Sequence, residues 1–577
     1  MSQDTVQGIR HSLAHLLAAA VQERFPGVKL GIGPVIENGF YYDFQFPESV
    51  SLSESDLPAL EARMRELISE KLSFTGRAIS AKEARKLFAK EPFKLELVDD
   101  YEKAGEALSM YETGGVFTDL CKGGHVESTS EIRPDAFKLT RIAGAYWKSN
   151  EKNAMLTRIY GVAFETKKEL EKYLEEIEEA KERDHRKLGK ELDLFTFSEL
   201  VGAGLPLWTP KGTVVREELR RALFDISKEF DVLPVTIPHM AKIELYEISG
   251  HAEKFKDELF KVVGHYGQDF VLKPVNCPHH TQIYASQPRS YRDLPLRYME
   301  STMQYRDEKP GEIGGLTRVR SITVDDGHTF CRLDQVKEEA ESIARIIEAF
   351  YTKLGLWGKH WVSLSVRDSE HLEKYIGEEK DWQKAEQYLE DVSDTLKLHA
   401  TRREGEAALY GPKLDYMFKD SMGREFQLAT IQLDFAMPKR FGLVYIGKGG
   451  KEETPVMIHR AILGSYERFL AILLEHFNGA LPMWLSPVQV AILPVGEKFV
   501  SYARTVAAQL KEANVRVELP EADETLGSRI RKAEMQKVPY IIVVGEKEEK
   551  AGTINVRPRG GEQYESSVEE LITAFSR

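Results

Sequence analysis

Three charged residues at the two ends of one loop have the types that bind nucleotides. Arg306 and Glu308 follow the strand-like run LRYMESTMQY, and Arg318 opens a second run, RVRSITVDDGH, beyond a loop containing glycine and proline. Two antiparallel strands joined by a mobile loop would direct both arginines into one cleft. Guanidinium groups bind phosphates and stack on bases, and a carboxylate accepts from an exocyclic amine. The pattern predicts a nucleotide triphosphate site, although a surface hairpin is the commoner role of an isolated Arg-x-Glu pair.

Four residues in the first part of the chain have the types and spacing of a metal site. His11 and His15 are about one helical turn apart, so they lie on one face of a helix. Cys121 and His125 form a second pair after Asp119, in the segment TDLCKGGH. Two such pairs match the nitrogen and sulfur preferences of a four-ligand zinc site.

The segments that must position these residues alternate between strand-like and helical patterns. A charged stretch, 165–194, has apolar residues in helical spacing and predicts a solvated connecting helix. It separates a mixed α/β segment, 1–164, from a long region of strands and helices, 195–481. The last segment, 482–577, alternates β-rich runs with helical stretches, which predicts a small α/β domain with a parallel or mixed sheet.

The composition is that of a folded protein with several domains. A chain of 577 residues predicts about three or four domains, and its 79 basic and 92 acidic residues give a net charge of −13. No apolar run reaches the roughly 18 residues of a transmembrane helix and no signal-peptide pattern begins the chain, so we expect a cytoplasmic protein without a membrane partner. The three cysteines are too few for a disulfide framework, so we expect buried thiols or metal ligands.

Motifs along nearly the whole chain resemble those of the threonyl-tRNA synthetases, a family of class II aminoacyl-tRNA synthetases. They are a segment around Pro238 running into SGH at 249–251, VNCPHH at 275–280, YRDE with its loop to RVRSITVDDGH, LYGPKLDYMFKDSMGREFQLATIQLDF, and PVMIHRAILGSYERF at 455–469. The resemblance implies an α+β multidomain protein whose catalytic core is an antiparallel sheet of six or seven strands. Its domains would be an α/β editing domain at 1–164, a linker helix at 165–194, the catalytic domain at 195–481 and an α/β anticodon-binding domain at 482–577.

The resemblance also implies which residues bind ATP. Arg306 would hold the α-phosphate and the carboxylate of threonine, and Glu308 would contact the adenine amine. Arg318 and Arg468 would bind the ATP phosphates, and Gln427 would lie near the adenylate.

The implied reaction has two steps. The carboxylate of L-threonine attacks the α-phosphate of ATP, which is bound with Mg²⁺, and the threonyl group then passes to the 3′ end of tRNA(Thr). Both steps require positioning and charge stabilisation more than a strong base. His251 is implied to lie beside the acceptor ribose, and a purely structural role is an equal alternative for it.

Cys277, His328 and His459 are far apart in the sequence, and on composition alone they are a buried thiol and two buried histidines. In the pattern of the family, NCP, DDxH and MIHRA each supply one ligand to a catalytic zinc, one per subunit, with a position left open. A metal that binds the substrate's amine and hydroxyl would reject valine, which an apolar pocket built for threonine cannot. The resemblance assigns further substrate contacts to Asp326, Tyr410 and Gln432.

Some positions near the implied zinc need a separate interpretation. His279 replaces the usual glycine, Val324 replaces the usual glutamine, and LAT at 428–430 replaces a Cys-Gly-Thr, so one substrate contact is in doubt. His279, His280 and Cys331 are rival ligands by type, and we interpret them as packing or supporting residues.

Serine keeps both groups that the zinc would bind and differs from threonine by one methyl, which supplies only about 1–3 kcal/mol of discrimination. A second, hydrolytic site is therefore expected. The first segment resembles the editing domain of bacterial members of the family, where His11, His15, Cys121 and His125, with Asp119, are associated with hydrolysis of seryl-tRNA by a bound water. We favour metal-free hydrolysis, and a bound ion remains open. A ubiquitin-like domain that usually precedes the HxxxH is expected to be missing.

The last segment resembles the anticodon-binding domain of class IIa synthetases. Glu548 and Arg557 lie where the family contacts anticodon bases, and Arg529 and Arg531 would add positive charge near that face. A solvated surface role is as good an interpretation for each charge taken singly.

The family further implies a homodimer, formed through the motif around Pro238. Another class II synthetase, such as the prolyl enzyme, and a non-catalytic tRNA-binding paralogue are the alternatives. The zinc triad and the two N-terminal pairs speak against the first. The retention of Arg306, Glu308, Arg318 and Arg468 speaks against the second.

Overall fold

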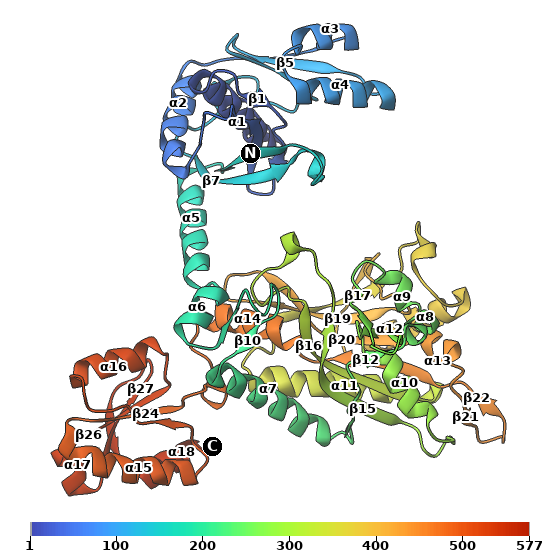
Figure 1. Ribbon diagram of the computed structural model, residues 1–577, viewed down its shortest axis with the longest axis vertical. Helices are drawn as coiled ribbons and strands as arrows, with labels where there is room; N and C mark the ends of the chain where they lie inside the picture. Colours follow the sequence, from blue (N-terminus) through green and yellow to red (C-terminus); the bar gives the residue numbers. More distant parts are fainter. Residues whose placement is uncertain (1–2, 576–577) are drawn as a thin grey trace. The chain divides into compact units, whose positions relative to one another are not determined.

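The computed structural model describes residues 3–575, which divide into two compact units between Glu179 and Ala180 (Figure 1). The predicted domain boundaries at 164/165 and 481/482 stay predictions. Among the described residues, none of the helices is both long and apolar enough to cross a bilayer.

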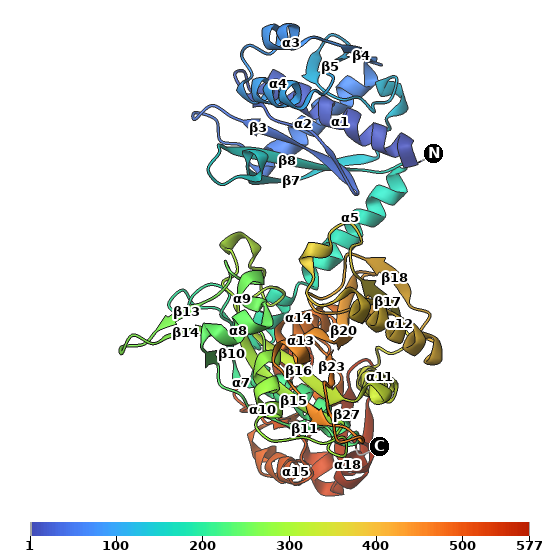
Figure 2. The ribbon, with the colours of Figure 1, turned by 90° about the vertical axis from the view of Figure 1, so that its right-hand side faces the viewer.

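The first unit is built on an antiparallel sheet covered by helices. The sheet has the order β1-β3-β8-β7, with β2 paired to β3, and α1 and α2 lie together on one of its faces (Figure 2). The elements are α1 (Gln3–Arg24), β1 (Lys29–Leu30), β2 (Val35–Ile36), β3 (Gly39–Gln45), α2 (Leu57–Ser69), β7 (Phe137–Tyr146) and β8 (Met155–Ala163). Leu13, Leu16 and Leu17 of α1 are fully buried against this sheet, so the helix that carries His11 and His15 is rigidly held.

A smaller antiparallel sheet, β4-β5-β6, supplies the second half of the N-terminal cluster. Its elements, with two adjoining helices, are β4 (Phe74–Ala78), α3 (Ala81–Leu87), α4 (Pro92–Ala104), β5 (Ser109–Thr113) and β6 (Phe117–Leu120). Asp119 lies on β6, and Cys121 directly follows that strand. The end of β6 therefore brings the predicted CxxxH pair to α1.

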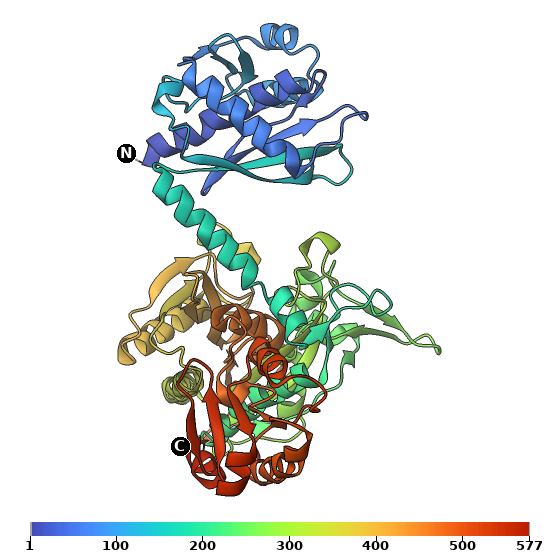
Figure 3. The same cartoon turned by 90° about the vertical axis from the view of Figure 1, so that its left-hand side faces the viewer.

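The predicted linker helix is wrong in part, because the stretch 165–194 forms two helices. The first, α5 (Lys167–Glu182), is amphipathic and runs across the boundary between the units (Figure 3). The second, α6 (His185–Glu191), begins after the N-cap Asp184 and buries Leu188 in the core of the second unit. The charge pattern indicated helix correctly, but it did not reveal that the second helix belongs to a packed core.

The second unit contains a mixed, mainly antiparallel sheet of eight strands in the order β11-β15-β16-β23-β20-β19-β17-β18. Its strands are β11 (Leu233–Pro234), β15 (Leu296–Tyr305), β16 (Ser321–Cys331), β17 (His360–Val366), β18 (Thr401–Glu404), β19 (Lys413–Lys419), β20 (Glu425–Asp434) and β23 (Val456–Ala461). The antiparallel prediction is confirmed for the central strands, whereas the predicted six or seven strands are too few. Both edge strands pair in parallel, and their short sequences, LP and TRRE, carry no apolar alternation.

Helices cover one face of this sheet and surround the other. On the first face α7 (Pro210–Lys228), α11 (Val336–Lys353), α12 (Glu379–Thr395) and α14 (Tyr466–Phe477) enclose the main core. The second face is lined by α8 (Ile243–Ser249), α9 (His251–Lys254), α10 (Cys277–Ala285) and α13 (Ala436–Arg440). Small pairings complete this region: β9 (Phe195–Thr196) with β10 (Leu207–Trp208), β12 (Met240–Ala241) and β13 (Lys261–Val263) with β14 (Asp269–Leu272), and β21 (Tyr445–Ile446) with β22 (Glu452–Glu453).

The last part of the chain forms a mixed sheet of order β25-β24-β26-β27-β28 with helices on both faces. β24 pairs in parallel with β25 and β26, and the other pairings are antiparallel, which confirms the mixed α/β prediction. The elements are β24 (Val490–Pro494), α15 (Val500–Glu512), β25 (Val517–Glu518), α16 (Leu526–Met535), β26 (Tyr540–Val544), α17 (Glu546–Ala551), β27 (Ile554–Pro558), β28 (Tyr564–Ser566) and α18 (Val568–Phe575).

Candidate active site and metal centres

Strand register brings together three residues that are distant in the sequence. His328 on β16 pairs directly with His459 on β23, and α10 begins at Cys277 beside the same face. Side chains alternate between faces along a strand, so Phe330 and Met457 pack with Cys277, whereas Cys331 packs into the main core on the other face. The ligand atoms of Cys277, His328 and His459 all lie within 4.8 Å of one another.

The donor set of this cluster fits a zinc ion with an open position. All three side chains are buried, and His328 Nε2 faces His459 Nδ1 at 3.0 Å. Nε2 of His459 lies 2.8 Å from the carboxylate of Asp434, which only accepts hydrogen bonds, so this nitrogen carries the proton and Nδ1 keeps its lone pair. One thiol and two imidazoles match the preferences of zinc.

The three predicted substrate residues surround this cluster. Tyr410 stacks on His459 with ring centroids 4.3 Å apart, and its hydroxyl donates to Oε1 of Gln432 at 2.8 Å. Asp326 lies 3.5 Å from Nε2 of His328 and accepts from the amide of Asn276 at 3.1 Å. Burial raises the pKa of the Asp326 carboxyl and raises that of the Tyr410 hydroxyl further.

Arg306 is positioned to receive an anion. Its guanidinium lies over the ring of Phe255 at 4.5 Å, and its Nε is buried without a hydrogen-bond partner anywhere in residues 3–575. Burial lowers the pKa of this arginine, and the carboxylates of Glu258 and Glu308 oppose that shift. A buried guanidinium with an unpaired donor is stabilised when a phosphate or carboxylate binds to it.

The other predicted ATP residues lie on the same loop or at neighbouring element ends. Glu308 accepts two hydrogen bonds from Arg318, at 2.8 and 2.7 Å. The residue predicted to contact the adenine base and one predicted to bind the phosphates therefore form an ion pair with each other. Arg468 is exposed in the first turn of α14, behind the N-cap Ser465. Gln427 is exposed on β20 and donates to Asp415 at 2.8 Å.

His251 lies between Phe255, which stacks on Arg306, and Tyr410, which stacks on His459. It is 4% exposed, its Nδ1 is 2.9 Å from the Ser249 hydroxyl, and its ring is 6.0 Å from Phe255 and 6.2 Å from Tyr410. Burial, with smaller effects of neighbouring cations, lowers the pKa of His251 to about 3. The imidazole is therefore neutral at pH 7 and keeps a lone pair for a proton.

His185 supports the loop that carries Arg306 and Arg318, and the sequence did not single it out. Its Nε2 accepts the backbone N–H of Leu316 at 3.0 Å, and its Nδ1–H donates to Glu475 at 2.6 Å. A β-carbon on Gly315 would lie 2.3 Å from Nε2, so only glycine fits there. Both ring nitrogens of His185 have partners, so His185 and Glu475 form a hydrogen-bonded latch on this loop, whereas Asp184 pairs with Arg186.

Replacing His185 by alanine is expected to raise the KM for ATP about tenfold, because Leu316 N–H and Glu475 lose a buried partner and the loop loosens. The unpaired groups should also destabilise the fold by about 1–3 kcal/mol. ATP-dependent kinetics and urea unfolding measure the two effects. His476→Ala is the control, at a half-buried histidine in α14, the helix that carries Glu475. An unchanged KM would show that the latch does not position the loop.

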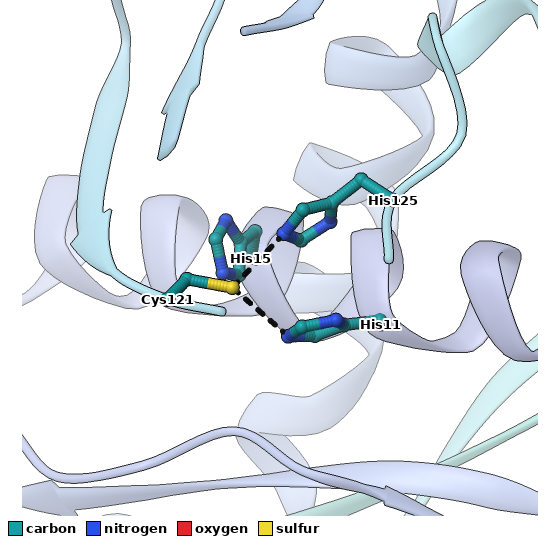
Figure 4. A group of neighbouring side chains, drawn as sticks. All are labelled: His11, His15, Cys121 and His125. Carbon is teal, nitrogen blue, oxygen red and sulfur yellow. Dashed lines mark hydrogen bonds between the residues drawn. The ribbon is translucent and has the colours of Figure 1, made fainter. Parts of the chain in front are cut away.

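The N-terminal cluster is also assembled (Figure 4). Cys121 Sγ lies 3.4 Å from His11 Nε2 and 3.3 Å from His125 Nε2, while the His125 ring centroid is 4.2 Å from those of His11 and His15. The four ligand atoms lie within 4.8 Å of one another. Burial lowers the pKa of His125 to about 2 and raises that of Cys121 to about 11, so the imidazoles and the thiol are neutral at pH 7.

Lys94 and Tyr42 join this cluster, although no sequence pattern predicted them. Asp119 accepts from the Tyr42 hydroxyl at 2.6 Å and from the Lys94 ammonium at 2.5 Å, and all three are buried. A cavity of about 290 Å³ is lined by His11, His15, Lys94, Asp119 and Cys121 among others. A lysine within the helical run PFKLELVDD carries no signal of burial, so only the packing of α4 reveals it.

The predicted anticodon residues lie at two element ends, and one neighbouring prediction is wrong. Glu548 caps α17 by accepting from Gly545 N–H at 2.9 Å, and Arg557 on β27 lines a cavity of about 650 Å³. Arg529, expected as a surface charge, is 4% exposed and donates to the backbone carbonyls of Glu524 and Pro494. It stabilises the domain because it satisfies buried carbonyl groups.

Family comparisons agree with this architecture. Residues 260–477 match the tRNA synthetase class II core domain (G, H, P, S and T), residues 489–577 match an anticodon-binding domain, and residues 108–160 match the second additional domain of threonyl and alanyl tRNA synthetases. The mainly antiparallel sheet, its arginine-bearing loop and these matches define a class II aminoacyl-tRNA synthetase.

Whole-chain comparisons narrow the class. A threonine–tRNA ligase of Thermus thermophilus is 49% identical over 95% of this chain and 85% of its own length, and one of Porphyromonas gingivalis is 45% identical over 98% and 88%. The chain therefore belongs to the threonine–tRNA ligase family. In structure, an RNA-binding domain of threonyl-tRNA synthetase from Cryptosporidium parvum matches with a TM-score of 0.65 at 34% identity, over 68% of this chain and 98% of that one. A Giardia lamblia prolyl-tRNA synthetase, at 17% identity and a TM-score of 0.55 over 69% of this chain and 76% of its own, shares the fold alone.

Proposed function

We propose that the protein carries out the reaction of its family. It forms threonyl-adenylate from L-threonine and ATP with Mg²⁺, transfers the threonyl group to tRNA(Thr), and hydrolyses seryl-tRNA(Thr) at a second site. The observation that carries the proposal is the convergence of Cys277, His328 and His459 on the sheet face that also bears Tyr410 and borders Arg306.

Cys277, His328 and His459 would hold a zinc ion. When bound, zinc would supply coordination positions beyond its three protein ligands for the amine and the hydroxyl of the substrate. Asp326 would accept from the hydroxyl, and Tyr410, held by Gln432, would contact the amine. Valine lacks the hydroxyl and would leave Asp326 unpaired, which is a strong basis for rejection.

The protein's own residues would align the reacting groups. Arg306 would neutralise the α-phosphate and the threonine carboxylate together, because its unpaired buried donor already favours an anion. Arg318 would leave Glu308 to bind a phosphate and free that carboxylate for the adenine amine. Arg468 would bind the γ-phosphate, and Gln427 would lie along the adenylate. His251, neutral at pH 7, would take part in proton movement at the acceptor ribose.

Amino-acid-dependent ATP–pyrophosphate exchange tests this proposal. We expect exchange with threonine, weak exchange with serine and none with valine or proline, and we expect a chelator to abolish it. No exchange in folded, metal-loaded protein would refute the synthetase activity and favour a non-catalytic tRNA-binding paralogue. Exchange with proline would indicate a prolyl-tRNA synthetase instead.

The N-terminal cavity would bind the seryl end of mischarged tRNA. The imidazoles of His11, His15 and His125 are neutral and keep lone pairs that can orient a water, and His11, which lines the cavity, would accept its proton, so hydrolysis there needs no metal. Asp119, held by Lys94 and Tyr42, supplies a fixed negative charge beside His15, at 3.9 Å. Four soft donors in contact also suit a zinc ion, and metal analysis of the isolated protein separates the two cases.

Replacing His11 by alanine is expected to slow hydrolysis of seryl-tRNA(Thr) by about 10²- to 10⁴-fold, the usual contribution of a general acid–base group. Threonine-dependent exchange should stay unchanged, because its site lies in the other unit. Deacylation of preformed seryl-tRNA measures the effect. Arg77→Ala, at an exposed arginine outside the cavity, serves as the control. Equal deacylation rates in wild type and His11→Ala would place the hydrolytic site elsewhere.

Two further features belong to the proposal. We infer a homodimer formed through the motif around Pro238. On the preceding edge strand β11, Leu233 is 52% exposed, and sedimentation would measure the dimer. We also infer that Glu548 and Arg557 contact the anticodon, which tRNA footprinting would test. A cytoplasmic location is inferred as well, and cell fractionation would test it.

A further inference from the structure

The second ring nitrogen of His328 has a histidine partner. Its Nδ1 lies 2.7 Å from Nδ1 of His280, and the two rings meet edge to face with centroids 4.7 Å apart. His328 is 1% exposed and His280 is fully buried, so water does not compete for this contact. Two facing ring nitrogens at this distance require one donor and one acceptor. The tautomer of His280 therefore decides which nitrogen of His328 keeps a lone pair.

Glu300 faces the other nitrogen of His280. Its Oε2 lies 3.7 Å from His280 Nε2, and neither atom has a hydrogen-bond partner within residues 3–575. Its Oε1 accepts the backbone N–H of Ile237 at 3.0 Å, which fixes the orientation of the carboxylate. At 3.7 Å the contact is electrostatic, since it is longer than a hydrogen bond. A carboxylate that only accepts favours the tautomer of His280 with the proton on Nε2.

The strand register explains why these three side chains meet. Glu300 on β15 pairs with Asp326 on β16, and Tyr298 pairs with His328, so Glu300 and His328 are diagonal neighbours on one face of the sheet. His280 lies one turn after Cys277 on α10, which covers this face. Lys273, which donates to Thr302 on β15 at 2.9 Å, adds a positive charge that interacts with Glu300.

We propose that Glu300 and His280 are positioning residues that hold His328 in the tautomer that binds the metal. With its proton on Nε2, His280 accepts at Nδ1 from Nδ1–H of His328. Nε2 of His328 then keeps its lone pair toward Nδ1 of His459, 3.0 Å away. Asp434 accepts directly from Nε2–H of His459, so Nδ1 of His459 also keeps its lone pair. This inference rests on the proposed zinc site and deepens it, because it names residues outside the ligand set that tune the affinity of that site.

The first test replaces Glu300 by glutamine. If the amide oxygen keeps the bond from Ile237, the amide N–H₂ faces His280 Nε2 and forces its proton to Nδ1, against Nδ1–H of His328. Zinc affinity is measured in the full-length protein by competition with a chromophoric chelator, and we expect the Kd to rise about 10- to 100-fold. Glu339→Gln is the matched control. The carboxylate of Glu339 is also buried and pairs with Arg297, which lies on the same strand as Glu300, but Glu339 belongs to α11, so zinc affinity should be unchanged.

The second test compares two substitutions of His280. His280→Gln retains an oxygen that can accept from Nδ1–H of His328, and His280→Leu fills similar space without an acceptor. We expect the glutamine to retain most of the zinc affinity and the leucine to lose it to the same extent as Glu300→Gln. A merely structural role would give equal losses in both variants, and that result would overturn the proposal.

A Cys277→Ala variant separates the inference from the function on which it rests. Zinc bound by the wild type and lost in Cys277→Ala defines the site, whatever the N-terminal cluster binds. If no such zinc exists, the proposed metal site itself is wrong. If it exists and both Glu300→Gln and His280→Leu hold it as tightly as the wild type, the metal site stands and the positioning role is refuted.

Discussion

Arg306→Ala is expected to lower threonine-dependent ATP–pyrophosphate exchange by roughly 10³- to 10⁵-fold, the range measured when a phosphate-stabilising arginine is lost. The guanidinium stacks on Phe255 and has a buried donor without a partner in the described chain. Alanine removes the charge that would meet the α-phosphate and the threonine carboxylate, so both binding and the transition state lose stabilisation.

The same substitution should leave the fold as stable as before or slightly more stable. Burial lowers the pKa of Arg306, so folding opposes its charged form, and removal of the side chain removes that cost. Its hydrogen bond to protein is a long one, 3.5 Å to the carbonyl of Pro274. Exchange assays and thermal melts on one preparation test both statements, with the exposed Arg345→Ala as control. A large drop in melting temperature would mean that Arg306 is structural and that the activity loss says nothing about phosphate binding.

Local patterns in the sequence predicted those parts of the sites that lie within one element or one hairpin. His11 and His15 are a helical turn apart, and α1 places them on one face as expected. Arg306 and Arg318 flank the loop between β15 and β16, and those strands pair antiparallel over ten residues as the hairpin interpretation required. In both cases the positions are fixed by backbone geometry over short sequence separations.

Sequence patterns could not predict contacts between residues that lie far apart in the sequence. His328 and His459 meet because β16 pairs with β23 in one particular register, and no local spacing encodes that register. Lys94, His185 and Glu300 look like ordinary charged or polar residues in helical or strand runs, yet all three are buried against site residues. Only the resemblance to a family predicted that Cys277 and the two histidines share a site. It did not predict the residues that position these three side chains.

Two fold predictions failed for related reasons. The charged run 165–194 was interpreted as one solvated helix, but Leu188 and Leu192 bury the second half in the catalytic core. Arg529 was interpreted as a surface charge, but its guanidinium satisfies buried carbonyls. Charged side chains with long aliphatic stems are compatible with both environments, so composition cannot separate them.

The second large effect is expected from Cys277→Ala. Loss of one of three protein ligands should release the catalytic zinc, and with it the contacts that would recognise the threonine amine and hydroxyl. We expect metal analysis to show one zinc fewer per chain and threonine-dependent exchange to fall by at least about 10³-fold, because a site built to pair a substrate hydroxyl discriminates by about 10⁴–10⁵ when that pairing works. Chelation of the wild type should reproduce the loss, and added zinc should restore the wild type but not the variant.

Cys331→Ala is the matched control, because it removes a thiol that is as deeply buried and belongs to the strand that carries His328. Cys331 lies on the opposite face of the sheet, in the main core, so its loss should cost stability without costing zinc. Seryl-tRNA hydrolysis should persist in both variants, since its residues lie in the first unit. If Cys277→Ala retained both zinc and exchange while Cys331→Ala lost them, the ligand assignment would be wrong. If both variants retained zinc and exchange, the metal would not belong to this sheet face, and recognition of threonine would have to rest on Asp326, Tyr410 and Gln432 alone.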